Sequence, residues 1–227
     1  MQHIITSTAA LEELAARLTA APAIGLDTEF LRKRTYRAEL CLLQASDAGS
    51  AVCVDPLALP DLAPLAHVLG AAQPVKVMHA SRQDIEVLLP ATGFVRPVFD
   101  TQIAAALTGL PAQIGYGELV RRVLGRELAK GHTRTDWTQR PLSSEQIEYA
   151  LDDVRYLLPL KAQLEEELHR LGRTAWLEQE LAGLMDASGF PVDPERAWLR
   201  LKGLRGLDAG RMQLARELAA WRERRAV

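Results

Sequence analysis

Two acidic residues, Asp27 and Glu29, lie two positions apart within an otherwise apolar part of the sequence. Residues 22–30 alternate apolar and other side chains, which predicts a β-strand. Side chains two apart on a strand project from the same face, so the two carboxylates are expected to repel each other. A hard divalent cation such as Mg²⁺, which takes oxygen ligands, would remove that cost. The pair is therefore a candidate metal site.

Three more residues complete the set of side chains that suggest chemistry. Tyr149 and Asp153 are four apart in a helical pattern, so they are predicted to share one helix face, whereas Asp152 faces elsewhere. Asp84 lies near the start of another predicted helix, directly after a strand that ends at His79. Each also fits a purely structural role: a surface pair for the first two, compensation of the helix dipole for Asp84, and a structural hydrogen bond for His79.

The elements that must position these residues follow from the apolar patterns. Three strands over residues 22–30, 38–45 and 50–55 form a predicted antiparallel meander, followed by alternating helices and short strands, which indicate parallel pairing. The expected architecture is α/β: a five-stranded mixed sheet with helices on both faces. The helices are expected at residues 9–18, 62–69, 81–89 with Ser81 as N-cap, and from 100 onward, and the later strands at 74–79 and 96–99.

The second half of the sequence is predicted to be mostly helical. Residues 130–142 are polar and contain Gly and Pro, which indicates a loop, and Ser143 with Gln146 then forms a capping-box pattern. A long amphipathic helix is expected from there to Arg170, and two or three more helices after Gly172. Residues 196–227 hold nine Lys or Arg and three Asp or Glu, which fits either a solvated surface or an arm that attracts phosphates.

Length and composition restrict the class of protein. The 227 residues, 48% of them hydrophobic, suffice for one large domain or one domain with a small appendage. No apolar run approaches the roughly 20 residues that a membrane helix needs, and no signal peptide is visible. The two cysteines form neither a disulfide framework nor a zinc site, so a cytoplasmic protein is expected. The net charge of −2 does not exclude a nucleic-acid partner.

Three segments carry a resemblance to a known family. LDTEF at residues 26–30, HASRQDIEVL at 79–88 and YALDDVRYL at 149–157 resemble the three exonuclease motifs of the DEDD superfamily, in the same order. The tyrosine at position 149 is typical of the DEDDy branch. The connecting segments FDTQIAAAL (99–107) and KGHTRTDWTQRPLS (130–143) are similar to ribonuclease D in particular, and the likeness covers roughly residues 1–170.

The resemblance implies a ribonuclease-H-like exonuclease fold over residues 1–170. Residues 171–227 would be a helical extension leading towards a C-terminal helical (HRDC-like) domain that the chain does not complete, in a shortened member or a truncated piece of one. The implied activity is metal-dependent 3′→5′ hydrolysis of single-stranded RNA ends, which releases nucleoside 5′-monophosphates. Precursors of tRNA are the implied substrates, and two divalent ions, Mg²⁺ or Mn²⁺, the implied cofactors.

The resemblance also assigns roles to the five motif residues. Asp27 is expected to bridge two ions, with Glu29 and Asp153 completing one and Asp84 holding the other. Tyr149 is expected to hydrogen-bond the attacking water and fix its line of attack.

Substrate contacts are expected around these motifs. Phe30 and Leu31 could pack on the terminal base or sugar, although Phe30 equally fits a core position. His79 could contact substrate, and Lys130 could neutralise the scissile phosphate or be an ordinary loop lysine. The basic run over residues 32–37 fits either a solvated loop or a grip on the RNA backbone. Trp137, in the polar loop, could stack on a base or anchor the loop.

Two other functions remain open from the sequence. One is a DNA exonuclease with the same motifs, which would lack a contact to the 2′-hydroxyl that distinguishes RNA from DNA. The other is a catalytically inactive module that binds nucleic acid. An inactive relative is expected to have lost a motif acid, whereas Asp27, Glu29, Asp84 and Asp153 are all retained.

Overall fold

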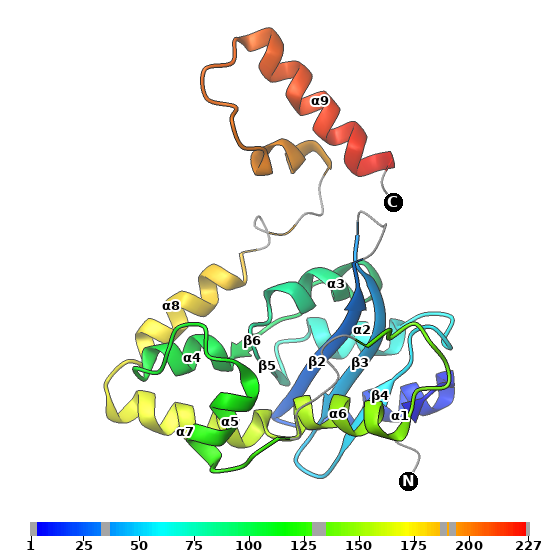
Figure 1. Ribbon diagram of the computed structural model, residues 1–227, viewed down its shortest axis with the longest axis vertical. Helices are drawn as coiled ribbons and strands as arrows, with labels where there is room; N and C mark the ends of the chain where they lie inside the picture. The colour runs from blue at the N-terminus through cyan, green and yellow to red at the C-terminus, as the bar shows by residue number, and fades with distance from the viewer. Residues whose placement is uncertain (1–3, 33–36, 129–134, 187–189, 191–193, 226–227) are drawn as a thin grey trace.

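A computed structural model of the protein describes residues 4–32, 37–128, 135–186, 190 and 194–225. The described residues form a mixed sheet of six strands in the order β1-β4-β3-β2-β5-β6 (Figure 1). Strands β2, β3 and β4 pair antiparallel, and the β1–β4, β2–β5 and β5–β6 pairs are parallel, which confirms the predicted meander and the parallel strands after it. The strands are β1 (Ile4–Ile5), β2 (Ala23–Leu31), β3 (Glu39–Ser46), β4 (Ala51–Val54), β5 (Val75–Met78) and β6 (Val98–Asp100).

The expected count of five strands was one too low. The additional strand, β1, has two residues, which pair with β4 through Ile4↔Cys53 and Ile5↔Val54. A two-residue strand has no alternation to detect, so its presence depends on the edge that β4 offers rather than on any local pattern.

Helices cover both faces of the sheet (Figure 1). On one face, leucines of α1, α2 and α3 pack on Leu26 and Leu43 in a fully apolar core. On the other face α6 lies over β2, β3 and β4, and α7 over β2 and β5. The helices of this part are α1 (Thr8–Thr19), α2 (Ala63–Gly70), α3 (Arg82–Thr92), α4 (Thr101–Leu107), α5 (Tyr116–Leu124), α6 (Ser144–Arg155) and α7 (Leu157–Arg170).

The single long helix expected up to Arg170 is two helices, α6 and α7, which meet at Tyr156. Proline explains the break: Pro159 has no N–H, and in a continuous helix its ring would clash with the carbonyl of Arg155. In the observed structure Pro159 falls within the first turn of α7, where proline is tolerated. The capping box of Ser143 and Gln146 at the start of α6 is present as predicted.

Ser81 was expected to cap α3, and that prediction was wrong. Its backbone is helical rather than extended, and its side chain makes no capping bond. Instead the Ser81 hydroxyl and amide both donate to one carboxylate oxygen of Asp100, each at 2.8 Å. The Ser81 side chain therefore ties the start of α3 to the end of β6.

Beyond α7 the described residues form α8 (Thr174–Leu184), a 3₁₀-helix η2 (Pro194–Arg200) and α9 (Ala209–Arg225), in agreement with the two or three helices expected. α8 packs on the domain through Leu177, which belongs to the same core as α4 and α7. Phe190 meets Phe94 edge-on at 5.3 Å, and the Arg82 guanidinium lies 5.1 Å from its ring centre. None of the helices among the described residues is long and apolar enough to cross a bilayer. The boundary at residue 170 stays a prediction.

Candidate active site

Asp27 and Glu29 lie where β2 extends beyond its parallel neighbour, β5. β2 pairs with β5 only from Ala23↔Val75 to Gly25↔Val77, whereas β2 continues to Leu31. Asp27 and Glu29 therefore lie beyond the last residue pair with β5, at the carboxyl end of the parallel strands, where open α/β sheets bind ligands. On the other side of β2 the register with β3 shifts between Glu29 and Phe30, which is a bulge next to the acids.

Three carboxylates converge at this point. One carboxylate oxygen from each of Asp27, Glu29 and Asp153 lies within 4.8 Å of the other two. The first two residues come from β2 and the third from α6, which crosses the same face of the sheet. Tyr149, one turn earlier on α6, is hydrogen-bonded through its side chain to Asp153. The neighbouring Asp152 instead forms an ion pair with Arg155, with 2.7 Å between the charged atoms.

A close approach of backbones sets the position of Asp153. The Ser46 hydroxyl on β3 donates to the carbonyl of Val154 at 2.9 Å, which ties the end of α6 to the sheet. Gly25 lies directly opposite Ser46 on β2. A Cβ at Gly25 would lie 2.3 Å from the Ser46 hydroxyl and 3.1 Å from the Val154 carbonyl. Glycine is thus required for α6 to sit close enough to bring Asp153 to the strand.

Asp84 approaches from the first turn of α3 and is buried. It lies outside the group of three converging oxygens, but its charge contributes to raising the pKa of Asp27, so the two carboxyls interact. Thr28, on β2 between the two acids, donates its hydroxyl to Asp84. The loop before α3 is held by Asp100, which also accepts from the Ala80 amide at 3.2 Å.

Burial and neighbouring carboxylates raise the pKa values of all four carboxyls. The neighbour is Asp100 for Asp84 and Asp152 for Asp153, whereas Asp27 and Glu29 are affected by other members of the site. Burial is the largest cause in each case. The pKa of Glu29 rises to about 8, that of Asp153 to about 7 and that of Asp84 to about 6. The pKa of Asp27 is held well above its ordinary value by burial and by the charges of Asp84, Asp153 and Glu29. Buried acids with like-charged neighbours are typical of sites that hold a cation or do acid–base chemistry.

The donor set fits a hard divalent ion. All the converging groups are carboxylate oxygens, the ligands that Mg²⁺ and Mn²⁺ prefer. Gln44 gives an independent observation: it is fully buried, directly across from Asp27 on β3, and its amide has no hydrogen-bond partner among the described residues. A buried unpaired amide is costly, and a hydrated ion beside Asp27 would bring water molecules that could pair with it. The chain's own residues therefore fit the cation that the sequence predicted.

The predicted substrate contacts are placed as follows. Phe30 and Leu31 are half-buried at the end of β2. His79 uses both ring nitrogens within the protein, at 2.9 Å from the Thr101 hydroxyl oxygen and 3.0 Å from the Ile114 carbonyl, which matches the structural alternative. Lys130 lies outside the described residues.

The basic run and the loop tryptophan are partly described. Arg32 forms an ion pair with Glu86 at 3.6 Å, and residues 33–36 lie outside the described part of the chain. Trp137 is only 5% exposed and stacks on the Tyr149 ring, with 6.2 Å between ring centres and 30° between planes. It cannot offer its face to a base in this position, so it anchors the loop.

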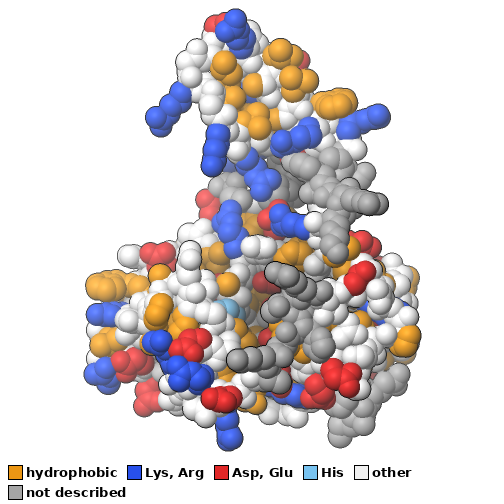
Figure 2. Space-filling model, in the orientation of Figure 1, with side chains coloured by type: hydrophobic (Ala, Val, Ile, Leu, Met, Phe, Trp, Pro, Cys, Tyr) orange, Lys and Arg blue, Asp and Glu red, His pale blue; other side chains and the backbone are white. Residues whose placement is uncertain are grey.

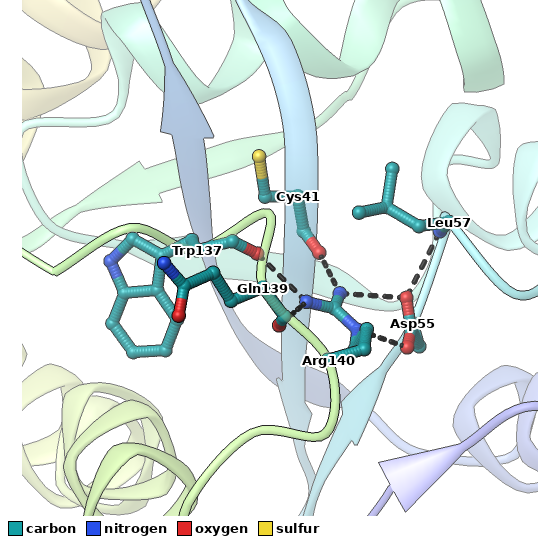
Figure 3. A network of polar contacts seen from close by, with 6 residues as sticks. All are labelled: Cys41, Asp55, Leu57, Trp137, Gln139 and Arg140. Atoms are coloured by element: carbon teal, nitrogen blue, oxygen red, sulfur yellow. Dashed lines mark hydrogen bonds and ion pairs between the residues drawn. The ribbon is translucent and has the colours of Figure 1, made fainter.

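Two structural contributions were missed from the sequence. The Tyr116 hydroxyl donates to the Asp152 carbonyl at 3.1 Å and accepts from the Tyr156 amide at 3.3 Å, so α5 holds the junction of α6 and α7. Arg140 forms a two-pronged ion pair with Asp55 at 2.6 and 2.8 Å (Figure 3). These pairs join residues far apart in sequence, and no local pattern around any of them predicted the contact.

Comparison with known proteins agrees with this geometry. Residues 2–169 match a family model described as 3′-5′ exonuclease. Ribonuclease D of Jannaschia sp. (strain CCS1) is 47% identical over 229 residues, which cover 98% of this chain and 59% of that protein.

Solved structures give the same relationship. Escherichia coli RNase D, described as an exoribonuclease involved in structured RNA processing, superposes with a TM-score of 0.90 at 37% identity, covering 100% of this chain and 60% of that one. Brucella melitensis NrnC with bound Mg²⁺ gives a TM-score of 0.66 at 32% identity, covering 85% and 91%. The chain thus spans less than two thirds of these ribonuclease D proteins. The fold is that of ribonuclease D. Because the family model matches most of the chain, and because the acids of this protein converge at the end of one strand, the protein belongs to the 3′-5′ exonuclease family.

Proposed function

We propose that the protein is a metal-dependent 3′→5′ exoribonuclease that hydrolyses the terminal phosphodiester of single-stranded RNA and releases nucleoside 5′-monophosphates. The observation that carries the proposal is the convergence of Asp27, Glu29 and Asp153 within 4.8 Å. RNA rather than DNA is favoured because the Jannaschia relative and the E. coli structure are both ribonucleases D by name. Precursors of tRNA are the substrate that follows from this relationship.

The acids of the site hold the cofactor in this proposal. Asp27, Glu29 and Asp153 would hold one ion, and Asp84, whose charge acts on Asp27, would help to hold a second. When bound, divalent ions supply positive charge that acidifies the attacking water and stabilises the leaving 3′-oxygen. Mg²⁺ is favoured over Mn²⁺, because a relative of similar length, Brucella NrnC, has been solved with Mg²⁺ bound.

Tyr149 orients the attacking water. Burial and the nearby acids raise the pKa of its phenol, so the hydroxyl keeps its proton at neutral pH. It donates to Asp153, and its lone pairs can accept a hydrogen bond from water held between it and the scissile phosphate. A fixed line of attack of this kind lowers the barrier by orientation.

A cytoplasmic location belongs to the same proposal. It is supported by the bacterial ribonuclease D relatives and by Cys41 and Cys53, which are both buried free thiols.

The first experiment replaces one acid and keeps its neighbour as a control. Asp27→Asn is expected to lower the rate on a labelled single-stranded RNA by more than about 1000-fold, because it replaces a charged carboxylate ligand with a neutral amide. Asp152→Asn is the matched control on α6, since its carboxylate pairs with Arg155 outside the site, and it should retain activity. Chelator should abolish activity, and Mg²⁺ or Mn²⁺ should restore it.

The outcome that contradicts the proposal is equally direct. Degradation that persists at the same rate in Asp27→Asn, or in excess chelator, would rule out the site. An RNA ending in a 2′-deoxynucleotide tests the substrate class: equal turnover of the two ends would favour a DNA exonuclease. Intact binding with no turnover in the unchanged protein would favour an inactive binding module.

A further inference from the structure

One guanidinium connects three separate parts of the chain near the site. Arg140, in the loop before α6, uses all five of its N–H groups. Two of them go to Asp55 at the end of β4, one to the carbonyl of Cys41 on β3, and two to carbonyls of the loop itself (Figure 3). The loop carbonyls belong to Trp137 and Gln139, each at 2.8 Å.

The Arg140–Asp55 pair is a strong contact. The Asp55 side chain is 6% exposed and that of Arg140 27%, so both are largely shielded from water. The guanidinium holds the pKa of Asp55 below its ordinary value despite the opposing effect of burial, so the carboxylate is charged at neutral pH. A bidentate pair with every donor used fixes orientation as well as position. We call this pair of Arg140 and Asp55 the Arg140 clamp.

The Arg140 clamp is connected to the acidic site in two ways. Cys41, whose carbonyl it binds, is the extra residue of β3 where the register shifts across from Glu29 and Phe30. Trp137, whose carbonyl it also binds, stacks on the Tyr149 ring. The same guanidinium therefore holds both β3, opposite Glu29, and the loop residue Trp137, whose ring stacks on Tyr149.

We propose that Arg140 and Trp137 are positioning residues for the hydrolysis, with Arg140 fixing the loop and the Trp137 indole fixing the ring of Tyr149. A phenol that pivots freely on α6 would bond its water in many directions, whereas a ring backed by a buried indole keeps one. Neither residue touches the substrate, since Trp137 is buried and the Arg140 donors are all used within the protein. The inference rests on the proposed function, in which Tyr149 orients the water.

A double-mutant cycle tests the inference. Trp137→Leu is expected to lower kcat on single-stranded RNA by about 10- to 100-fold with KM nearly unchanged, because the effect is on orientation rather than binding. In a Tyr149→Phe background, which lacks the hydroxyl, the same substitution should lower kcat no further. Trp137→Phe, which keeps an aromatic ring behind Tyr149, should recover most of kcat.

Arg140 is tested in the same two backgrounds. Arg140→Lys keeps a positive charge for Asp55 but cannot make the five hydrogen bonds of the guanidinium. The substitution should therefore lower kcat when Tyr149 is present and leave kcat unchanged in the Tyr149→Phe background. Arg170→Lys is the matched control, because Arg170 forms an exposed two-pronged pair with Glu167 on α7, far along the chain from the loop. It should leave kcat unchanged. Melting temperatures of all variants identify any loss that reflects unfolding.

The outcomes separate the two proposals. Losses from Trp137→Leu or Arg140→Lys that multiply with the loss from Tyr149→Phe would overturn the positioning role while leaving the proposed function intact. A Tyr149→Phe variant with full kcat would overturn both the positioning role and the assigned role of Tyr149, whereas the test with Asp27→Asn would still decide the nuclease itself. If Trp137→Leu does not fold, Arg140→Lys in the two backgrounds gives the same decision.

Discussion

At the scale of single residues, the protein accepts a cluster of buried acids that opposes its own folding. Burial, and to a smaller extent neighbouring carboxylates, raises the pKa values of Glu29, Asp153 and Asp84 to about 8, 7 and 6. In the unfolded chain the same carboxyls titrate near pH 4. Between these values the folded protein holds more protons than the unfolded chain, so each such group contributes stability below about pH 4 and loses it as the pH rises.

We therefore predict that the metal-free protein loses stability as the pH rises from about 5 to about 8 at these groups. Glu29→Gln should flatten that loss, because it removes the carboxyl whose pKa is raised to about 8. His79 acts in the opposite sense, since burial lowers its pKa, so the informative quantity is the difference between the two proteins. Thermal unfolding in chelator across this pH range measures it.

The same measurement with Mg²⁺ present gives the control. An ion held by the carboxylates displaces their protons, so the pH dependence should shrink and the melting temperature should rise at neutral pH. Parallel curves for the unchanged protein and Glu29→Gln in chelator would contradict the raised pKa of Glu29.

At the scale of elements, the site depends on how closely α6 approaches β2. Gly25 permits that approach, because a methyl group there would lie 3.1 Å from the Val154 carbonyl and would overlap the Ser46 hydroxyl. We predict that Gly25→Ala lowers the free energy of unfolding by about 1–3 kcal/mol, the usual cost of overpacking. It should also lower kcat, because Asp153 precedes the displaced carbonyl. Denaturant unfolding and steady-state kinetics measure the two effects.

A second glycine provides the comparison. Gly117 lies within α5, and among the described residues an added Cβ there would meet only Leu128, at 4.0 Å. Gly117→Ala should be neutral or stabilising by about 0.5–1 kcal/mol, because alanine favours the helix. Equal effects of the two substitutions would show that the approach of α6 to the sheet is not what Gly25 provides.

Local patterns predicted most elements, and the exceptions have physical causes. The alternation around Asp27 and Glu29 predicted the central strand, and the spacing of Tyr149 and Asp153 predicted their shared helix face. Pro159 indicates a break between α6 and α7, whereas the spacing of apolar residues alone predicts one continuous helix. No local pattern could reveal the two-residue strand β1.

The sequence predicted which acids belong to the site, but it predicted little of how they are arranged in space. Spacing places Asp27 beside Glu29, but only the fold brings Asp153 to them across the sheet. Supporting contacts such as Arg140 with Asp55 join positions 85 residues apart, and each partner alone is an ordinary charged residue. Such pairings depend on topology, so they could be found only in the folded structure.

At the scale of the whole molecule, charge is distributed unevenly. The net charge is only −2, yet residues 196–227 hold nine Lys or Arg against three acids. Figure 2 shows Lys and Arg side chains spread over the C-terminal segment, above the body that contains the sheet. Some are neutralised, such as Arg224 by Glu195 at 2.6 Å. Lys202 and Arg205 are exposed and have no ion-pair partner among the described residues.

We predict that this segment contributes electrostatic attraction for RNA rather than catalysis. Lys202→Glu should raise KM for single-stranded RNA at low salt and leave kcat unchanged. The slope of log affinity against log salt should fall by about 0.7 for each phosphate that the variant no longer neutralises. Arg170→Glu on α7 changes the net charge equally and is the control. Because attraction by total charge would affect both variants alike, an equal rise in KM for the two would show that the C-terminal segment has no particular role. A rise confined to Lys202→Glu would show that the RNA backbone passes the segment between η2 and α9.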